Sequence, residues 1–290
     1  MSEIIASLSD ISDRYDALFV DLWGCVHDGV RAYEAANEAL ISYRKAGGKV
    51  VLVTNSPKPR SGVEKQLLKF GVLEDAWDSI ATSGDSARAA MYQGVVGKRV
   101  YFIGEPRDAP FFEPMTILES PIAIERVPLS EAEGIVCTGP FDPKADPLEM
   151  RSSFLFAQQK GLKLLCANPD IVVDRGYERE WCAGALAQLY IEMGGDSLFF
   201  GKPHPPIYDL ALRRLAVLDS TIGKQRILAI GDGIQTDIKG AISEDIDSLF
   251  ITGGLAAAPT KTEDQPDKAA LEAYIEQEKQ LPTYSIGFLR

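Results

Sequence analysis

Short apolar runs alternate with longer amphipathic segments along most of the chain. Eight near-continuous apolar runs predict buried strands, at 17–22, 50–53, 100–103, 134–137, 162–166, 197–200, 227–230 and 248–251. Helical spacing of apolar residues lies between most of them, at 35–45, 62–70, 86–92, 148–160, 183–193 and 207–215. This alternation predicts βαβ units and an α/β fold with a Rossmann-like parallel-sheet core.

The pattern changes in the middle of the chain, where prolines crowd together and the apolar runs are shorter. The prolines are Pro106, Pro110, Pro114, Pro121, Pro128, Pro140, Pro143 and Pro147. We predict an inserted α/β cap domain over 84–181, because the strands on either side need one another to form one sheet. The core domain then comprises 1–83 and 182–254. Residues 255–290 are expected to add a helix within 260–279 and an edge strand at 283–288.

Composition and charge narrow the function classes. The net charge is -12 and there is no long Lys/Arg run, so neither nucleic acid nor an anionic membrane surface is an expected partner. No signal-peptide pattern or apolar stretch near ~20 residues is found, which predicts a cytoplasmic protein. The four cysteines are scattered without a Cys-x-x-Cys pair, so buried reduced thiols are expected; Cys25 lies near the first motif, but nothing nearby favours a thiolate.

Carboxylates lie at the ends of two of the predicted strands. Asp21 lies at the end of the first, and Asp232 and Asp237 follow the strand at 227–230. The carboxyl ends of parallel strands meet at one edge of a sheet, which is where chemistry is located in such folds. A carboxylate at the end of a buried strand is costly without a partner. Oxygen atoms from two or three of these carboxylates and a backbone carbonyl would suit Mg²⁺.

Two further segments could hold an anion. Thr54, Asn55 and Ser56 end the second strand ahead of a helix, and backbone amides there make a seat for a phosphate. Lys202 follows a strand and is held by prolines, so its ammonium could neutralise a carboxylate and an incoming phosphate together. Each residue alone also has an ordinary interpretation, as a turn, a helix cap or a solvated lysine.

These segments together resemble the haloacid dehalogenase superfamily. Asp21-Leu22-Trp23-Gly24, Thr54-Asn55, Gly201-Lys202-Pro203 and Gly231-Asp232 through Asp237 are similar to its four motifs and occur in the same order. The long insert and the run Ala167-Asn168-Pro169-Asp170 resemble class IIA of that family, the sugar-phosphate and nitrophenyl-phosphate phosphatases with an α/β cap. The resemblance covers about residues 15 to 254.

The resemblance implies a role for each motif. Asp21 would be the nucleophile and form an aspartyl-phosphate. Mg²⁺ would be held by Asp21, the backbone carbonyl of Trp23, Asp232 and Asp237.

The remaining motifs would bind a small phosphorylated metabolite. Thr54 and the amides around Asn55 and Ser56 would hold the phosphoryl oxygens, while Lys202 would balance charge in the transition state. Two residues of the insert would face the leaving group, namely Asn168 and Asp170.

One position departs from the family pattern. Trp23 stands where the family's phosphatases carry the aspartate that protonates the leaving group and then activates water, and an indole can do neither. General acid-base catalysis typically contributes ~10² to 10⁴ in rate, so slow turnover is expected. His27, Asp28 and His204 are the candidates to replace that group.

Two alternatives to a phosphatase stay open. The superfamily's dehalogenases carry an aromatic residue at the position of Trp23 and use the aspartate without metal, although the paired Asp232 and Asp237 argue against that reading. The other alternative is a catalytically silent protein that binds a phosphorylated ligand or a partner. A homodimer also stays open as an assembly.

Overall fold

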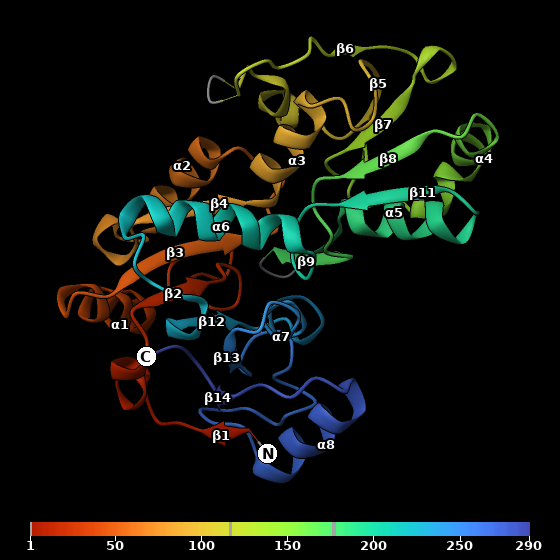
Figure 1. Cartoon of the computed structure of the whole chain (residues 1–290). Coiled ribbons are helices and arrows are strands. Elements are labelled where there is room, and N and C mark those ends of the chain that lie inside the picture. The colour runs from red at the N-terminus through yellow and green to blue at the C-terminus, as the bar shows by residue number, and fades with distance from the viewer. Residues whose placement is uncertain (1, 116–117, 176–177) are drawn as a thin grey trace. The chain divides into compact units, whose positions relative to one another are not determined.

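The computed structural model describes residues 2–115, 118–175 and 178–290, and the chain forms two compact units. Unit 1 comprises Met1–Thr54, Glu64–Ala81 and Tyr208–Arg290, and unit 2 comprises Asn55–Val63 and Thr82–Ile207. Figure 1 shows the chain coloured from its N-terminus to its C-terminus. The sequence-based division, with a cap over 84–181, stays a prediction about separate domains.

Unit 1 is built on a seven-stranded sheet, which confirms the predicted parallel core. Its order is β1 (Glu3–Ile4), β14 (Tyr284–Ile286), β13 (Asp247–Ile251), β12 (Ile227–Gly231), β2 (Ala17–Val20), β3 (Lys49–Thr54) and β4 (Ser79–Thr82). The pairs from β1 to β3 are all parallel. The inner strands β2 and β12 are buried along their whole length, because a parallel sheet is covered on both faces.

The sequence predicted an edge strand near the C-terminus, but this strand lies inside the sheet. β14 pairs with β13 on one side and with β1 on the other, so β1 is the outer strand. The polar N-terminus gave no apolar run to predict β1, whose two residues are exposed.

The helices follow the predicted pattern closely. Unit 1 contains α1 (Glu34–Lys45), α7 (Lys239–Ser243) and α8 (Lys268–Glu278), and α1 packs against β3 while α7 packs against β13. Residues of both units occur in α2 (Arg60–Phe70) and α6 (Pro205–Leu218). Within residues 2–115, 118–175 and 178–290, no helix has the length and apolar character needed to cross a membrane.

Unit 2 has its own parallel sheet. The order is β11 (Asp196–Phe199), β8 (Lys163–Cys166), β7 (Gly134–Cys137), β5 (Arg99–Ile103) and β6 (Glu125–Arg126). A separate antiparallel hairpin is formed by β9 (Val172–Arg175) and β10 (Glu178–Trp181). The helices are α3 (Ser83–Tyr92), α4 (Arg151–Gln159) and α5 (Ala183–Glu192), and Figure 1 shows α5 alongside β11.

Alternate residues of the unit 2 strands enter two separate cores. Val136 of β7 packs with Met91 of α3, whereas its neighbour Ile135 packs with Phe154 of α4 and Tyr190 of α5. Side chains along a strand point to opposite faces, so the sheet is covered on both sides. This double cover makes the carboxyl ends of the strands the natural place for polar side chains.

Candidate active site and metal centre

The carboxyl ends of β2 and β12 bring two aspartates together. Val20 is opposite Ile230 in the parallel register, and the Asp21 amide donates to the Ile230 carbonyl at 2.8 Å. Asp21, Cys25 and Asp232 each offer one ligand atom, and these atoms all lie within 4.8 Å of one another. The residues are 8%, 1% and 6% exposed, respectively. Two carboxylates and a thiol thus form one buried cluster, which we call the ligand cluster.

Two glycines let the backbone approach Asp232. A Cβ at Gly24 or at Gly254 would lie 2.1 Å from Asp232 Oδ2, and Gly24 also has a φ of +70°. The Leu255 amide donates to the same oxygen at 3.1 Å. Because no side chain fits at either position, the loops after β2 and β13 can close around this carboxylate.

Asp237 lies in the wide helical turn η8 (Ile234–Ile238) that follows Asp232. Its Oδ2 accepts a hydrogen bond from the Gly233 amide at 3.1 Å and from the Thr236 hydroxyl at 3.3 Å. Gly231 is required nearby, since a Cβ there would lie 2.1 Å from Asp237 Cγ. Asp237 is 6% exposed, and its role as a further metal ligand stays a prediction.

Thr54 is the last residue of β3, next to β2 in the same sheet. It is buried, with 1% of its surface exposed. Asp21, Thr54 and Asp232 therefore lie at the carboxyl ends of three neighbouring strands of unit 1, the arrangement that the sequence pattern predicted.

Asn55 belongs to unit 2, where its side-chain amide joins two segments distant in sequence. Its Nδ2 donates to Asp170 Oδ1 at 2.7 Å and to the Lys202 carbonyl at 3.1 Å, and its Oδ1 accepts from the Lys202 amide at 2.7 Å. Asn55 and Lys202 are 4% and 3% exposed. Three residues selected from the sequence are thus joined in one network, which we call the Asn55 network; Asn55 and Lys202 are buried and Asp170 is half-buried.

The surrounding loops are shaped for the Asn55 network. Asn168 Oδ1 accepts from the Asp170 amide at 3.0 Å, which holds this turn closed. A Cβ at Gly201 would lie 2.4 Å from Asn55 Oδ1 and 2.7 Å from the Ser83 hydroxyl. Only glycine fits at position 201, so this close packing helps to fix the backbone that carries Lys202.

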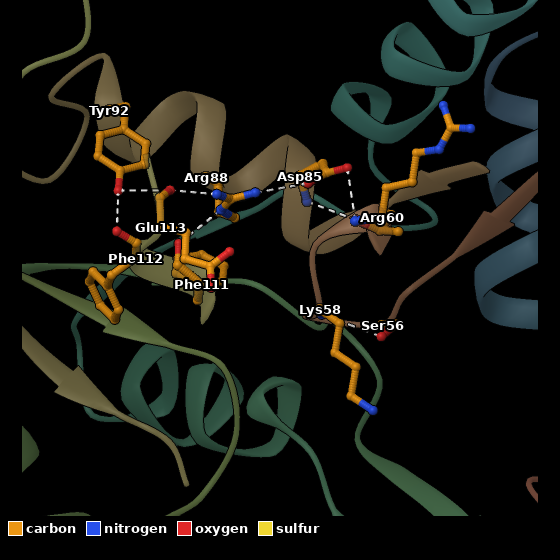
Figure 2. Close-up of polar contacts among 10 residues, drawn as sticks. Ser56, Lys58, Arg60, Asp85, Arg88, Tyr92, Phe111, Phe112 and Glu113 are labelled. Atoms are coloured by element: carbon orange, nitrogen blue, oxygen red, sulfur yellow. Dashed lines mark hydrogen bonds and ion pairs between the residues drawn. The ribbon is translucent and has the colours of Figure 1, made fainter. Parts of the chain in front are cut away.

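Ser56 and the residues after it are attached to the start of α3 (Figure 2). The Ser56 hydroxyl accepts from the Lys58 amide at 3.3 Å, and its carbonyl accepts from the Gly84 amide at 3.0 Å. The Arg60 amide donates to Asp85 Oδ2 at 3.2 Å. These bonds fix the segment that carries the predicted phosphate-binding residues.

Sequence reasoning missed the buried ion pair shown in Figure 2. Arg88, which is 6% exposed, bonds to Asp85 Oδ1 at 3.1 Å and to the carbonyls of Phe111 and Glu113 at 2.8 and 2.6 Å. The available signal was Thr82, whose side chain accepts from the Asp85 amide at 2.9 Å as a helix N-cap. Arg88 ties the proline-rich segment to α3.

Known proteins resemble this chain over nearly its whole length. Residues 18–116 match the family model described as haloacid dehalogenase-like hydrolase, and residues 199–274 match the HAD-hydrolase-like model. A crystal structure of a haloacid dehalogenase-like family hydrolase from Brucella suis is 38% identical, covers 99% of this chain and 100% of its own, and has a TM-score of 0.85. The chain belongs to the haloacid dehalogenase-like hydrolases. This confirms the resemblance found in the motifs.

More distant members of this hydrolase family carry named activities. An acid sugar phosphatase of Staphylococcus saprophyticus is 24% identical over 249 residues, which is 83% of this chain and 88% of that protein. A glycerol phosphate phosphatase of Mycobacterium tuberculosis, solved in complex with magnesium, is 21% identical with a TM-score of 0.67 and covers 95% of this chain and 76% of its own. At 21% identity, the likeness to the Mycobacterium structure shows the fold alone.

Trp23 of this hydrolase packs onto the loop that follows it. Its ring lies 5.2 Å from the His27 ring in an edge-on arrangement. A Cβ at Gly29, where φ is +83°, would lie 2.2 Å from the indole atom Cζ3. The indole therefore packs closely against this loop, at a position where only glycine leaves room for it.

His27 is poorly placed to replace the missing acid-base group. It is 1% exposed, lies between Trp23 and Phe70, and its Nδ1 accepts from the Gly29 amide at 3.1 Å. Burial lowers the pKa of His27 to about 4, although the nearby Asp28 charge acts in the opposite direction. At neutral pH the ring is therefore uncharged, and its role is in packing the loop.

The other two candidates also have structural roles. Asp28 Oδ1 accepts from the amides of Val30 and Arg31 at 2.9 and 2.8 Å, as in an ordinary Asx turn. Burial would raise the pKa of Asp28, but these bonds and the Arg31 charge outweigh it, so the pKa is lowered. His204 stacks on Phe199 in unit 2, with ring centroids 4.8 Å apart.

Proposed function

We propose that this protein is a Mg²⁺-dependent hydrolase of small phosphate monoesters that uses Asp21 as its covalent nucleophile. The observation that carries the proposal is the approach of Asp21 and Asp232 in the buried ligand cluster. Two desolvated carboxylates that are this close strongly favour a bound cation. The named activity of the Staphylococcus relative supports a phosphorylated substrate, with sugar phosphates among the candidates.

The donor set of this edge fits Mg²⁺. Asp21 and Asp232 would supply carboxylate oxygens, with the Trp23 carbonyl and Asp237 completing the protein ligands. When bound, the ion supplies positive charge that offsets the phosphoryl oxygens during transfer.

In the proposed reaction an Asp21 oxygen attacks phosphorus and the bond to the leaving oxygen breaks. Water then attacks the phosphorus of the aspartyl-phosphate, which releases inorganic phosphate and restores the carboxylate. The leaving oxygen must take its proton from water, because Trp23 cannot donate one. Slow hydrolysis follows from this feature.

The proposal also assigns the phosphate and substrate contacts. Thr54, Asn55, Ser56 and Lys202 would bind the phosphoryl group, with Lys202 offsetting its charge. Asn168 and Asp170 would contact the remainder of the substrate, which makes their loop a determinant of specificity.

The test is phosphate release from a panel of sugar phosphates, glycerol phosphate and p-nitrophenyl phosphate, with Mg²⁺ or with a chelator. Release should need Mg²⁺ and fall at least ~10³-fold in Asp21→Asn, since the nucleophile is lost. Asp245→Asn, an exposed aspartate of unit 1, is the matched charge control and should retain full activity. Equal release by the Asp21 variant would overturn the proposal.

Trp23 also favours a second candidate, a hydrolase of carbon–halogen bonds that uses Asp21 without metal. The approach of Asp232 to Asp21 counts against it, because a metal-free site has less use for two adjacent carboxylates. Halide release from 2-haloacids that persists in chelator would favour this candidate. Binding of a phosphate ester without any product would instead indicate a silent binding protein.

A further inference from the structure

The ligand cluster contains a sulfur atom that the proposed phosphatase chemistry does not use. Cys25 is 1% exposed, and its Sγ lies within 4.8 Å of oxygens of both Asp21 and Asp232. The turn that presents it is held by backbone bonds from the Val26 amide to Leu22 and from the Gly24 amide to His27, at 2.8 and 3.0 Å. The backbone that carries the thiol is therefore held beside the two carboxylates.

The three donors lie near enough to approach a shared ion. Zinc binds thiolate sulfur at about 2.3 Å and carboxylate oxygen at about 2.0–2.2 Å in tetrahedral geometry, so two such donors on one ion lie about 3.3–3.7 Å apart. The ligand atoms of the cluster lie within 4.8 Å of one another, so they would have to approach by at most about 1.5 Å. Side-chain rotation on binding would supply this approach.

A cavity of about 450 Å³ in unit 1 reaches the same turn. Its lining includes Gly24, Cys25 and Tyr33 together with Phe288 and Leu289. A metal site needs an entry path as well as ligands, and this cavity brings solvent to the sulfur-bearing loop.

We propose that Cys25 makes this a site for two classes of divalent ion. Mg²⁺ requires oxygen ligands in octahedral geometry and would be held by the carboxylates without the sulfur. Zn²⁺, Co²⁺ and Cd²⁺ accept thiolate, so each would bind Cys25, Asp21 and Asp232 together and release the thiol proton to solvent.

The consequence for activity rests on the proposed function. A thiophilic ion that engages Asp21 with the Cys25 thiolate would hold the nucleophile in a sulfur-bound centre, so these ions should inhibit the Mg²⁺-dependent reaction. The metal preference itself rests on the cluster alone.

The test is a Co²⁺ and Cd²⁺ titration of the full chain, with sulfur-to-metal charge-transfer absorption and calorimetry as readouts. The wild type should show the charge-transfer band, and Cys25→Ser should lose it. Removing a direct ligand should weaken Cd²⁺ binding at least ~10-fold, given that even outer-shell partners contribute 10–100-fold, while Mg²⁺ affinity should stay within about 2-fold.

Three further variants isolate the cluster. Cys182→Ala removes a thiol of unit 2 and should keep the band, whereas Asp232→Asn should lose it. Cys25→Ala is a second way to remove the sulfur if the serine variant folds poorly. A band that persists in both Cys25 variants, or Co²⁺ binding without any band, would overturn the proposal.

The two proposals can fail separately. Sulfur-to-metal absorption without phosphate release in Mg²⁺ would remove only the proposed phosphatase function. Phosphate release in Mg²⁺ without that absorption would remove only the proposed role of Cys25.

Discussion

The predicted site residues of unit 1 are mostly carboxylates, whereas those of unit 2 are joined by a neutral amide. In unit 1, Asp21 and Asp232 approach each other in a buried place. In unit 2, Asn55 donates to Asp170 and exchanges bonds with the backbone of Lys202. One region concentrates like charge, and the other pairs donors with acceptors.

The two regions should therefore differ in how far their stability depends on a bound metal. A bound cation offsets the charge of adjacent buried carboxylates, so the ligand cluster should be stabilised by its metal. Hydrogen bonds that are satisfied within the protein need no added ligand, so the Asn55 network should be stable alone. Perturbing each region should therefore give distinct results, with the largest change expected in catalysis.

Trp23→Asp adds an acid-base group to the acidic region of unit 1. Hydrolysis of phosphate monoesters should rise by about 10² to 10⁴ in kcat, the usual contribution of general acid-base catalysis. The measurement is steady-state phosphate release below the unfolding temperature. Trp23→Asn is the matched control of nearly equal shape; a similar gain in that variant would mean that relief of packing, not the carboxylate, is responsible.

Asn55→Asp changes a donor into an acceptor in unit 2. Its oxygen would then face Asp170 and the Lys202 carbonyl, both acceptors, and the free energy of unfolding should fall by about 3 kcal/mol. Urea unfolding at neutral pH measures the loss. The double variant Asn55→Asp/Asp170→Asn restores one donor–acceptor pair and should recover part of it, and no recovery would show that this pair is not what stabilises the network.

Metal removal should lower the free energy of unfolding through the ligand cluster and not through the Asn55 network. At a Mg²⁺ concentration 100 times its Kd, the wild type should gain about 2.7 kcal/mol in free energy of unfolding over its value in chelator. Asp232→Asn should gain far less, while the exposed control Asp245→Asn should gain as much as the wild type. Thermal unfolding with and without chelator is the measurement, and an equal gain in the Asp232 variant would place the ion elsewhere.

Acid should destabilise the loop that contains Trp23, because His27 in the same loop is buried in its neutral form. The folded pKa of His27 is about 4 and its ordinary value is 6.5, so between these pH values the unfolded state binds more protons and stability falls as pH falls. Between pH 7.5 and pH 5 the wild type should lose about 2 kcal/mol more than His27→Asn, by urea unfolding. His204→Asn is the matched control and should behave as the wild type does.

The sequence predicted the parts of the fold that are determined locally. The apolar runs that became β2, β3 and β12 are nearly continuous, since inner parallel strands are buried on both faces. The hairpin of β9 and β10 was missed because residues such as Glu178 and Arg179 are polar and exposed. β1 was also missed, since it has only two residues, and β4 was missed although its four residues are all buried.

The candidate site was predictable only in part. Asp21 and Asp232 follow apolar runs, and a parallel sheet necessarily brings those run ends to one edge. Gly24 and Gly254 both approach Asp232 closely, and these contacts join positions that are far apart in sequence. The partners of Asn55 are likewise more than 100 residues away, beyond the reach of periodicity.

The position of β14 between β1 and β13 has a consequence for folding during synthesis. The sheet of unit 2 is complete with residues up to 199, so its strands are all synthesised before β12, β13 and β14 of the other sheet. Within this other sheet β1 precedes the other strands in sequence, but it cannot pair until residues 284–286 are made. During synthesis, β1 must therefore wait for its neighbour until the other strands of its sheet have been made.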